Sequence, residues 1–157
     1  MADQVQSFYG NRLRVRVCGL CIKDGAILLV NHKSLGNTDF WAPPGGGLEF
    51  GETAEACLAR EISEETGLEV SVHEFLFVAE YLKPPLHAVE LFFRVSVTRG
   101  NLQVGSDPEM NEAQIIQDVK FIPLRSLQTF TGESLHGIFR FVPEAAKIIG
   151  LKGYFKL

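Results

Sequence analysis

Hydrophobic and polar residues alternate near the start of the chain. Over residues 12–17, aliphatic side chains alternate with three arginines, a period of two that is typical of a strand with one buried face. A turn signal, Lys-Asp-Gly at 23–25, separates this segment from a continuous apolar run at 26–30. We therefore expect these two strands to form a hairpin. A polar loop at 31–39 and a short strand at 40–42 should follow it.

The period changes from two to that of a helix after residue 53. Ala54, Leu58 and Ile62 are spaced by four residues and predict the core-facing stripe of a helix. Thr53 is a suitable N-cap, since its hydroxyl can accept a hydrogen bond from an amide of the first turn. The helix should run to residue 66, because Gly67 supplies a C-terminal signal.

The second half of the chain is dominated by segments that are typical of strands. Residues 69–82 and 86–98 are rich in Val, Phe and Leu, with two prolines between them, and predict a long antiparallel pair. A strand at 118–123, a turn or short helix at 124–127 and a C-terminal helix at 143–149 should follow. The apolar tail, GYFKL, either completes a sheet or meets a partner subunit.

This order of elements predicts a fold of the α/β class, more closely the α+β type. We expect a mixed β-sheet between helices, which is an α/β/α sandwich. A chain of 157 residues is long enough for one domain with a sizeable core, so residues 1–157 should form a single domain. Residues 1–10 should be a flexible leader.

Composition narrows the functional classes. The net charge of −4 argues against nucleic-acid binding through a basic surface. No apolar run approaches the length of about 20 residues that a membrane span needs, so we expect no membrane partner. The first residues lack a signal pattern, which makes the cytoplasm the expected location. Cys18 and Cys21 should face opposite sides of one strand, so their C-x-x-C spacing does not predict a metal or redox site.

The most unusual feature is a cluster of glutamates near the end of the predicted helix. Glu61, Glu64 and Glu65 fall at i, i+3 and i+4 and therefore share one helix face. A solvated face is one explanation, but the helix dipole and like-charge repulsion both oppose carboxylates there. A divalent cation would reverse these unfavourable terms, and clustered hard oxygen ligands favour magnesium or manganese over zinc. The three glycines at 45–47 would let the backbone approach a ligand closely.

The same stretch resembles the signature of the Nudix hydrolase family. That signature requires a Gly, five residues, a Glu, seven residues and then R-E-U-x-E-E-x-G-U, where U is aliphatic. This chain has Gly46, Glu52 and the run REISEETGL over residues 60–68, so every fixed position matches. The resemblance implies the family's α/β/α sandwich and magnesium-dependent cleavage of a nucleoside diphosphate linked to another group, by water attack at phosphorus.

The resemblance also implies roles for individual residues. Glu61, Glu64 and Glu65 would bind magnesium or manganese, with the carbonyl of Gly45 as a further ligand. Glu52 and Arg60 would form a salt bridge that ties the loop to the helix. Gly46 and Gly67 are the fixed glycines of the signature.

Two assignments stay open. The general base is either Glu61 or a glutamate of the acidic loop at 105–114, where Glu112 is favoured over Glu109 and a solvated loop is the alternative. The substrate is the second open assignment. A non-catalytic, ligand-sensing Nudix domain is less consistent with the complete glutamate set.

A few residues outside the signature are candidates for choosing the substrate. Pro84 lies 16 residues beyond Leu68, a spacing that resembles a marker of the ADP-ribose pyrophosphatase subgroup, although a proline in a turn is the simpler explanation. We therefore favour a nucleotide sugar such as ADP-ribose, with nucleoside triphosphates as the alternative. Trp41 would stack on a base or fill the core under the glycine loop. Lys33, Arg14 or Arg16 would meet a phosphate, and either His87 or Glu90 would face the cleft. A small nucleotide is the expected partner, and the protein is expected to be a monomer or homodimer.

Overall fold

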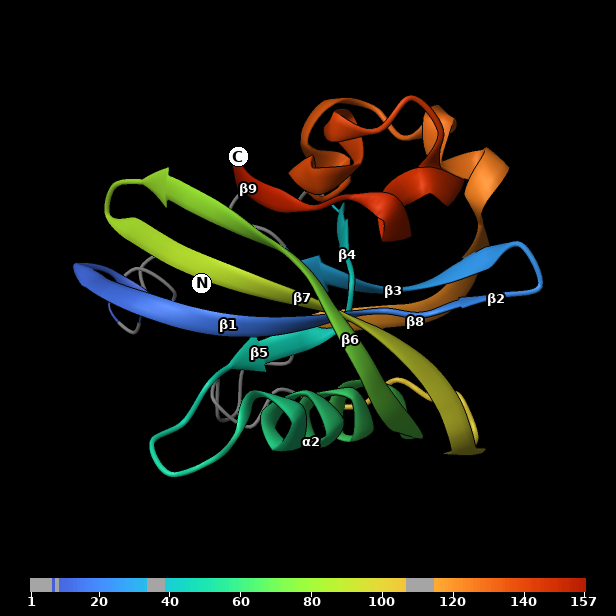
Figure 1. Ribbon diagram of the computed structural model, residues 1–157, viewed down its shortest axis with the longest axis horizontal. Helices are drawn as coiled ribbons and strands as arrows, with labels where there is room; N and C mark the ends of the chain where they lie inside the picture. Colours follow the sequence, from blue (N-terminus) through green and yellow to red (C-terminus); the bar gives the residue numbers. More distant parts are fainter. Residues whose placement is uncertain (1–6, 8, 34–38, 107–114) are drawn as a thin grey trace.

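Two β-sheets cross at the centre of the molecule, with α2 below them and a layer of 3-10 helices above (Figure 1). The computed structural model describes residues 7, 9–33, 39–106 and 115–157. The larger sheet has the strand order β5-β1-β7-β6-β9, and the smaller has β2-β3-β4 with β8 paired to β3. The strands are β1 (Arg12–Leu20), β2 (Ile22–Lys23), β3 (Ala26–Lys33), β4 (Asp39–Ala42), β5 (Gly45–Gly47), β6 (Leu68–Lys83), β7 (Leu86–Gly100), β8 (Ile116–Pro123) and β9 (Gly153–Lys156).

This arrangement confirms the α/β class with a mixed sheet between helical layers. The helix α2 (Ala54–Thr66) covers one side, as the spacing of its apolar residues predicted. The opposite side is covered by η2 (Leu124–Thr129), η3 (Gly132–Ser134), η4 (Gly137–Phe141) and η5 (Ala145–Gly150). Among the described helices, none is long and apolar enough to cross a membrane.

The predicted hairpin between the first two long strands is wrong. β1 pairs in parallel with β7 and antiparallel with β5, which leaves neither of its edges for β3. The short strand β2 pairs with β3 instead, across the turn at 23–25. Cys18 and Cys21 lie in different core clusters on opposite sides of the sheet, as their spacing predicted. Alternation identified the strand but could not identify its partner, because both partners come from distant parts of the chain.

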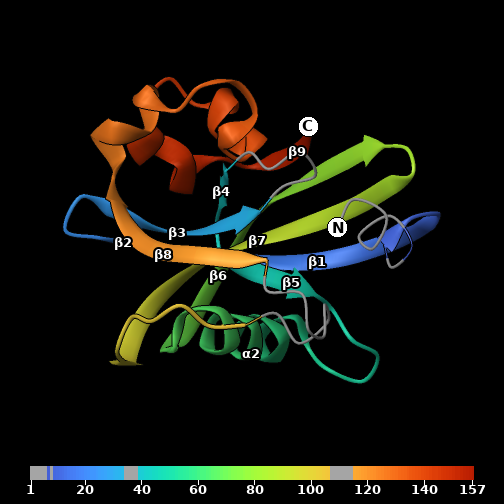
Figure 2. The ribbon, with the colours of Figure 1, turned by 180° about the vertical axis from the view of Figure 1, so that it is seen from behind.

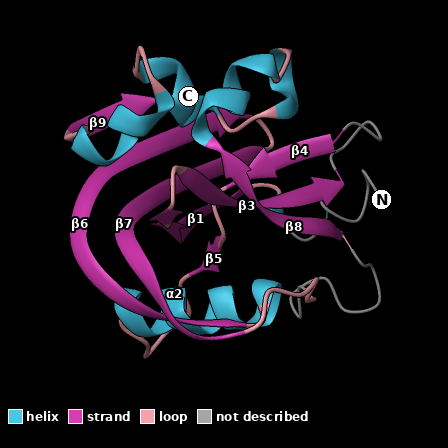
Figure 3. Cartoon of the chain, turned by 90° about the vertical axis from the view of Figure 1, so that its right-hand side faces the viewer, coloured by secondary structure: helices cyan, strands magenta, loops and turns pink. Residues whose placement is uncertain are grey.

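The long antiparallel pair is confirmed, whereas the C-terminal helix differs from its prediction. β6 and β7 pair along their lengths and curve around the other elements (Figure 3). The segment predicted as a helix at 143–149 forms the short 3-10 helix η5. In η5, the amide of Lys147 donates to the carbonyl of Glu144, three residues earlier, at 2.9 Å. A segment this short completes few α-helical bonds, and 3-10 turns are common in such short pieces. The tail forms β9 beside β6, which confirms that it completes a sheet.

Two apolar clusters hold the layers together. Leu58 and Ile62 of α2 pack with Val17 of β1 in the lower cluster. In the upper cluster, the rings of Phe77 and Phe92 stack with centroids 4.6 Å apart, and both side chains are fully buried. The upper cluster joins the larger sheet to the 3-10 layer.

We expect Phe92→Ala to lower the free energy of unfolding by about 3–5 kcal/mol, because it leaves a cavity beside Phe77. Phe50→Ala is the matched control, since Phe50 is fully exposed and its loss should change stability by no more than about 0.5 kcal/mol. Urea unfolding of both variants measures the difference. Equal losses in the two variants would contradict the packing described.

Candidate metal and catalytic site

Helix α2 begins and ends where local chemistry requires. Thr53 Oγ1 accepts a hydrogen bond from the amide of Ala56 at 3.1 Å. Gly67 adopts the left-handed conformation, with φ 72°, and its amide donates to the carbonyl of Ser63. These caps fix the helix over Ala54–Thr66 and set which residues fall in its last turn. Glu64 and Glu65 therefore lie at its C-terminal end.

Strand β5 brings backbone against two of the glutamates. The amide of Gly45 donates to Glu65 Oε2 at 3.0 Å. The carbonyl of Gly45 accepts a hydrogen bond from Arg16 Nη2 at 3.4 Å. A Cβ placed on Gly46 would lie 2.2 Å from the carboxyl carbon of Glu61, so only glycine leaves room for that side chain. The glycines thus allow buried carboxylates to lie directly against a strand.

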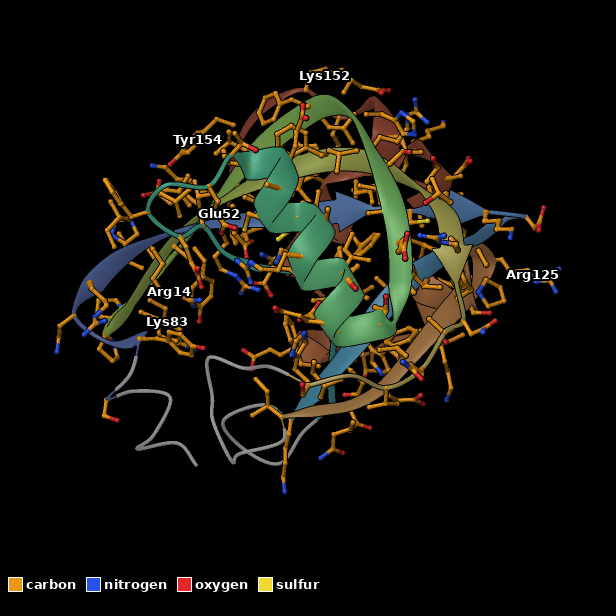
Figure 4. All side chains as sticks on the ribbon, turned by 90° about the horizontal axis from the view of Figure 1, so that it is seen from below. Arg14, Glu52, Lys83, Arg125, Lys152 and Tyr154 are labelled. Atoms are coloured by element: carbon orange, nitrogen blue, oxygen red, sulfur yellow. The ribbon has the colours of Figure 1, made fainter. Side chains whose placement is uncertain are left out.

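Arg60 contacts three glutamates. Its Nη2 and Nε lie 2.8 Å and 3.2 Å from the two carboxylate oxygens of Glu52, which is the pair expected from the sequence. Its Nη1 also donates to Glu64 Oε2 at 3.3 Å, a pair spaced by four residues on the helix, and to Glu61 Oε1 at 2.8 Å, a contact that the sequence did not predict. Hydrogen bonds from Arg60, and then from the amide of Glu49, lower the pKa of Glu52 to about 2. Figure 4 shows Glu52 on the loop that leads into α2.

A second charged network lies behind the glycines. Glu90 is buried on β7, with Arg16 Nη1 3.6 Å from its Oε1 and His136 Nε2 2.9 Å from its Oε2. The Nδ1 of His136 accepts from the amide of Ile138, so Nε2 carries the hydrogen that is donated to Glu90. Burial alone would raise the pKa of Glu90, but the contacts with His136 and Arg16 hold it well below its ordinary value.

The donor set fits a hard divalent cation. Negative charge is in excess around Arg16 and Arg60, even though Arg14 also acts on Glu90. The five carboxylates around these arginines are Glu52, Glu61, Glu64, Glu65 and Glu90. Glu61 and Glu65 are 4% and 3% exposed, which makes that excess costly without a cation. Within the described part of the chain, no three His, Cys, Asp or Glu side chains already converge on one point. Glu61 and Glu64 contact Arg60, whereas Glu65 contacts the amide of Gly45.

The other residues predicted for the site contact parts of the protein outside this carboxylate cluster. Trp41 is half-buried, edge-on to Phe130 with ring centroids 6.4 Å apart, and lines a hollow of about 270 Å³ beside the 3-10 layer. It packs against the upper core cluster and not under the glycine loop, which was the core position expected from the sequence. Lys33 pairs in the sheet with Asp39 at the end of β3.

Pro84 and His87 line a second hollow, of about 280 Å³, at the tip of the β6–β7 hairpin. His87 Nε2 lies 2.7 Å from Glu80 Oε1, so its contact is with a neighbouring strand. Figure 4 shows Arg14 and Lys83 on this projecting part of the sheet, to one side of α2. The candidate bases Glu109 and Glu112 lie outside the described residues.

Comparison with known proteins identifies the class of this fold and site. The family model described as the NUDIX domain matches residues 10–140, and the chain belongs to this family. An ADP-ribose pyrophosphatase of Methanocaldococcus jannaschii is 38% identical over 100 residues, which are 62% of this chain and 59% of that protein. The nucleoside triphosphatase NudI of an Enterobacter strain is 31% identical over 125 residues, or 75% of this chain and 87% of that protein.

A solved structure shows the same fold. The MutT NUDIX hydrolase of Burkholderia pseudomallei superposes with a TM-score of 0.66 at 23% identity, over 83% of this chain and 95% of that one.

A putative ADP-ribose pyrophosphatase of Bacillus subtilis, YjhB, is 29% identical over 80% of this chain. The matched regions span 58% to 60% of the length of the M. jannaschii and B. subtilis relatives and of a MutT-like protein of Streptomyces ambofaciens.

The depressed pKa of Glu90 predicts a pH dependence of stability. As the pH falls, the Glu90 carboxyl of the unfolded chain, with a pKa of about 4.3, binds a proton before the same carboxyl of the folded protein does. The stabilising contribution of the ionised Glu90 is therefore present above the pKa of the unfolded chain and is lost as the pH falls toward the pKa of the folded protein. We expect Glu90→Gln to lower the free energy of unfolding by about 1–3 kcal/mol at pH 7, and the difference from the parent to shrink below pH 4.5.

Urea unfolding from pH 7 to pH 3 measures this difference. Glu133→Gln is the control, because Glu133 is exposed on η3 and should show no comparable loss. A Glu90→Gln effect that is constant across this pH range would rule out the assignment.

Proposed function

We propose that this chain is a magnesium- or manganese-dependent pyrophosphohydrolase that cleaves a nucleoside diphosphate linked to another group, by water attack at phosphorus. The observation that carries the proposal is the excess of carboxylates around Arg16 and Arg60, three of which, Glu61, Glu65 and Glu90, are buried. Glu61, Glu64, Glu65 and the carbonyl of Gly45 would hold the cation. When bound, the cation neutralises the diphosphate and lowers the pKa of a water.

The chain's own residues would position the reaction. Arg60 remains fixed to Glu52 through Nε and Nη2 if its Nη1 releases Glu61 and Glu64. The side chain of Arg16 is 28% exposed, and its contacts with Glu90 and with the carbonyl of Gly45 are long, at 3.6 and 3.4 Å, so its guanidinium is suited to meet a phosphate oxygen. The proton from the attacking water would pass to Glu61 or to Glu112; Glu109 is the less favoured loop residue.

We favour a nucleotide sugar of the ADP-ribose type as substrate. The support is that two of the relatives are named as ADP-ribose pyrophosphatases, one of them putative. The alternative is a nucleoside triphosphate, which the name of the NudI relative supports. A non-catalytic sensor is the weaker reading, because the glutamate set is complete. We propose further that residues 1–157 form one cytoplasmic domain, which is a monomer or a homodimer. Its partner would be a small nucleotide rather than nucleic acid or a membrane.

A substrate panel with product identification tests the function. ADP-ribose, other nucleotide sugars, and normal and oxidised nucleoside triphosphates are incubated with magnesium or manganese, and the products are separated. We expect turnover that EDTA abolishes and added magnesium restores. AMP and ribose 5-phosphate would indicate a nucleotide sugar, whereas a nucleoside monophosphate and pyrophosphate would indicate a triphosphate. Absence of turnover in every combination would refute the proposal for these substrates.

Glu61→Gln and Glu64→Gln should each lower kcat by about 100-fold or more, since several kcal/mol of charge stabilisation depend on the cation that they would hold. Glu55→Gln is the matched control, because Glu55 is an exposed glutamate in the first turn of the same helix. It should keep kcat within about twofold of the parent. A normal kcat in both site variants would contradict the metal assignment.

A further inference from the structure

The end of α2 is bound by a segment from a distant part of the chain. The amides of Gln103, Gly105 and Ser106 donate to the carbonyls of Thr66, Glu65 and Glu64 at 2.9, 2.9 and 3.1 Å. We call residues 103–106 the strap. In Figure 2 it is the yellow segment that leaves β7 and runs along α2. The strap therefore pairs the last three carbonyls of the helix, which have no partner within it.

Gly105 allows this close approach. A Cβ at this position would lie 1.7 Å from the carbonyl oxygen of Glu64 and 2.8 Å from the carbonyl carbons of Glu64 and Glu65. Its backbone does not adopt the left-handed conformation, so the requirement for glycine is one of space alone. Any larger residue must push the strap away from the helix backbone, because the atoms in its way belong to the main chain.

The strap also acts on the electrostatics of the site. The C-terminal carbonyls of a helix carry partial negative charge, which disfavours carboxylates in the last turn. Three amide hydrogens placed on those carbonyls offset part of that charge beside Glu64 and Glu65. The same bonds fix the backbone from which these two side chains project. A helix end that frayed would let the two carboxylates move apart, and a shared cation needs both at fixed positions.

We propose that the strap is a positioning element for the cation site, with Gly105 as its positioning residue. It holds the backbone of Glu64 and Glu65 so that both carboxylates reach one divalent cation. This inference rests on the metal binding proposed above.

Titration with Mn²⁺, followed by electron paramagnetic resonance of the free ion, tests the strap without any substrate. Gly105→Ala should raise the Mn²⁺ dissociation constant about tenfold or more, the loss typical when a residue that orients a ligand is changed. Gly150→Ala is the matched control, because a Cβ there meets nothing and its φ is not in the left-handed region. It should bind Mn²⁺ as the parent does.

A second pair of variants tests the strap if Gly105→Ala does not fold. Ser106→Pro removes the amide hydrogen that donates to the carbonyl of Glu64 and also fixes φ at that position, whereas Ser106→Ala keeps the amide; the serine side chain is exposed. We expect weaker Mn²⁺ binding in the proline variant alone. Amide hydrogen exchange should also speed up at residues 103 and 105 in that variant, which reports on the strap itself.

Ile148→Val separates positioning from general loss of stability. Ile148 is fully buried in the 3-10 layer, so its truncation should lower the melting temperature and leave Mn²⁺ affinity unchanged. Equal weakening in Ile148→Val, or parent-like affinity in Gly105→Ala and Ser106→Pro, would overturn the role of the strap alone. Failure of the parent protein to bind Mn²⁺ would overturn the metal dependence, and the strap's role with it.

Discussion

Negative charge held at low exposure is the constraint on which this structure depends. Glu61 and Glu65 are almost fully buried, and an unpaired carboxylate in that position would destabilise the fold by several kcal/mol. Arg60 and Arg16 offset part of this charge. Gly46 provides the space in which Glu61 lies against β5. The arginines, the glycines and the helix end therefore have to be considered as one unit rather than as separate features.

Local patterns predicted the parts of this unit that lie close together in sequence. The glutamates at i, i+3 and i+4, the cap at Thr53 and the Glu52–Arg60 pair all come from one short stretch, where helical geometry alone sets the distances. The long β6–β7 pair was predictable for the same reason, because its two strands are joined by a tight turn. The class of fold followed from the order of such local elements.

The parts that could not be predicted depend on pairing between distant residues. β1 pairs with β7 rather than with β3, since periodicity shows which face of a strand is buried and not which strand lies beside it. Glu90 and His136 are 46 residues apart in sequence, and neither belongs to a recognisable spacing. Within the 3-10 layer, the segments at 124–127 and 143–149 were predicted as short helical pieces and form η2 and η5, whereas η3 and η4 were not predicted, because their apolar residues show no helical period. Trp41 packs against the core cluster beside that layer, and this position also depends on residues distant in sequence.

The pairing of β1 has a consequence for the order of events during synthesis on the ribosome. The residues of α2 and β5 emerge early, but β1 gains its second neighbour only with β7, and the last carbonyls of α2 gain their donors only with residues 103–106. Domains with such distant pairings fold slowly and as units. A nascent chain that stops before residue 103 would therefore carry the whole glutamate signature and still lack the amides that pair the last carbonyls of α2.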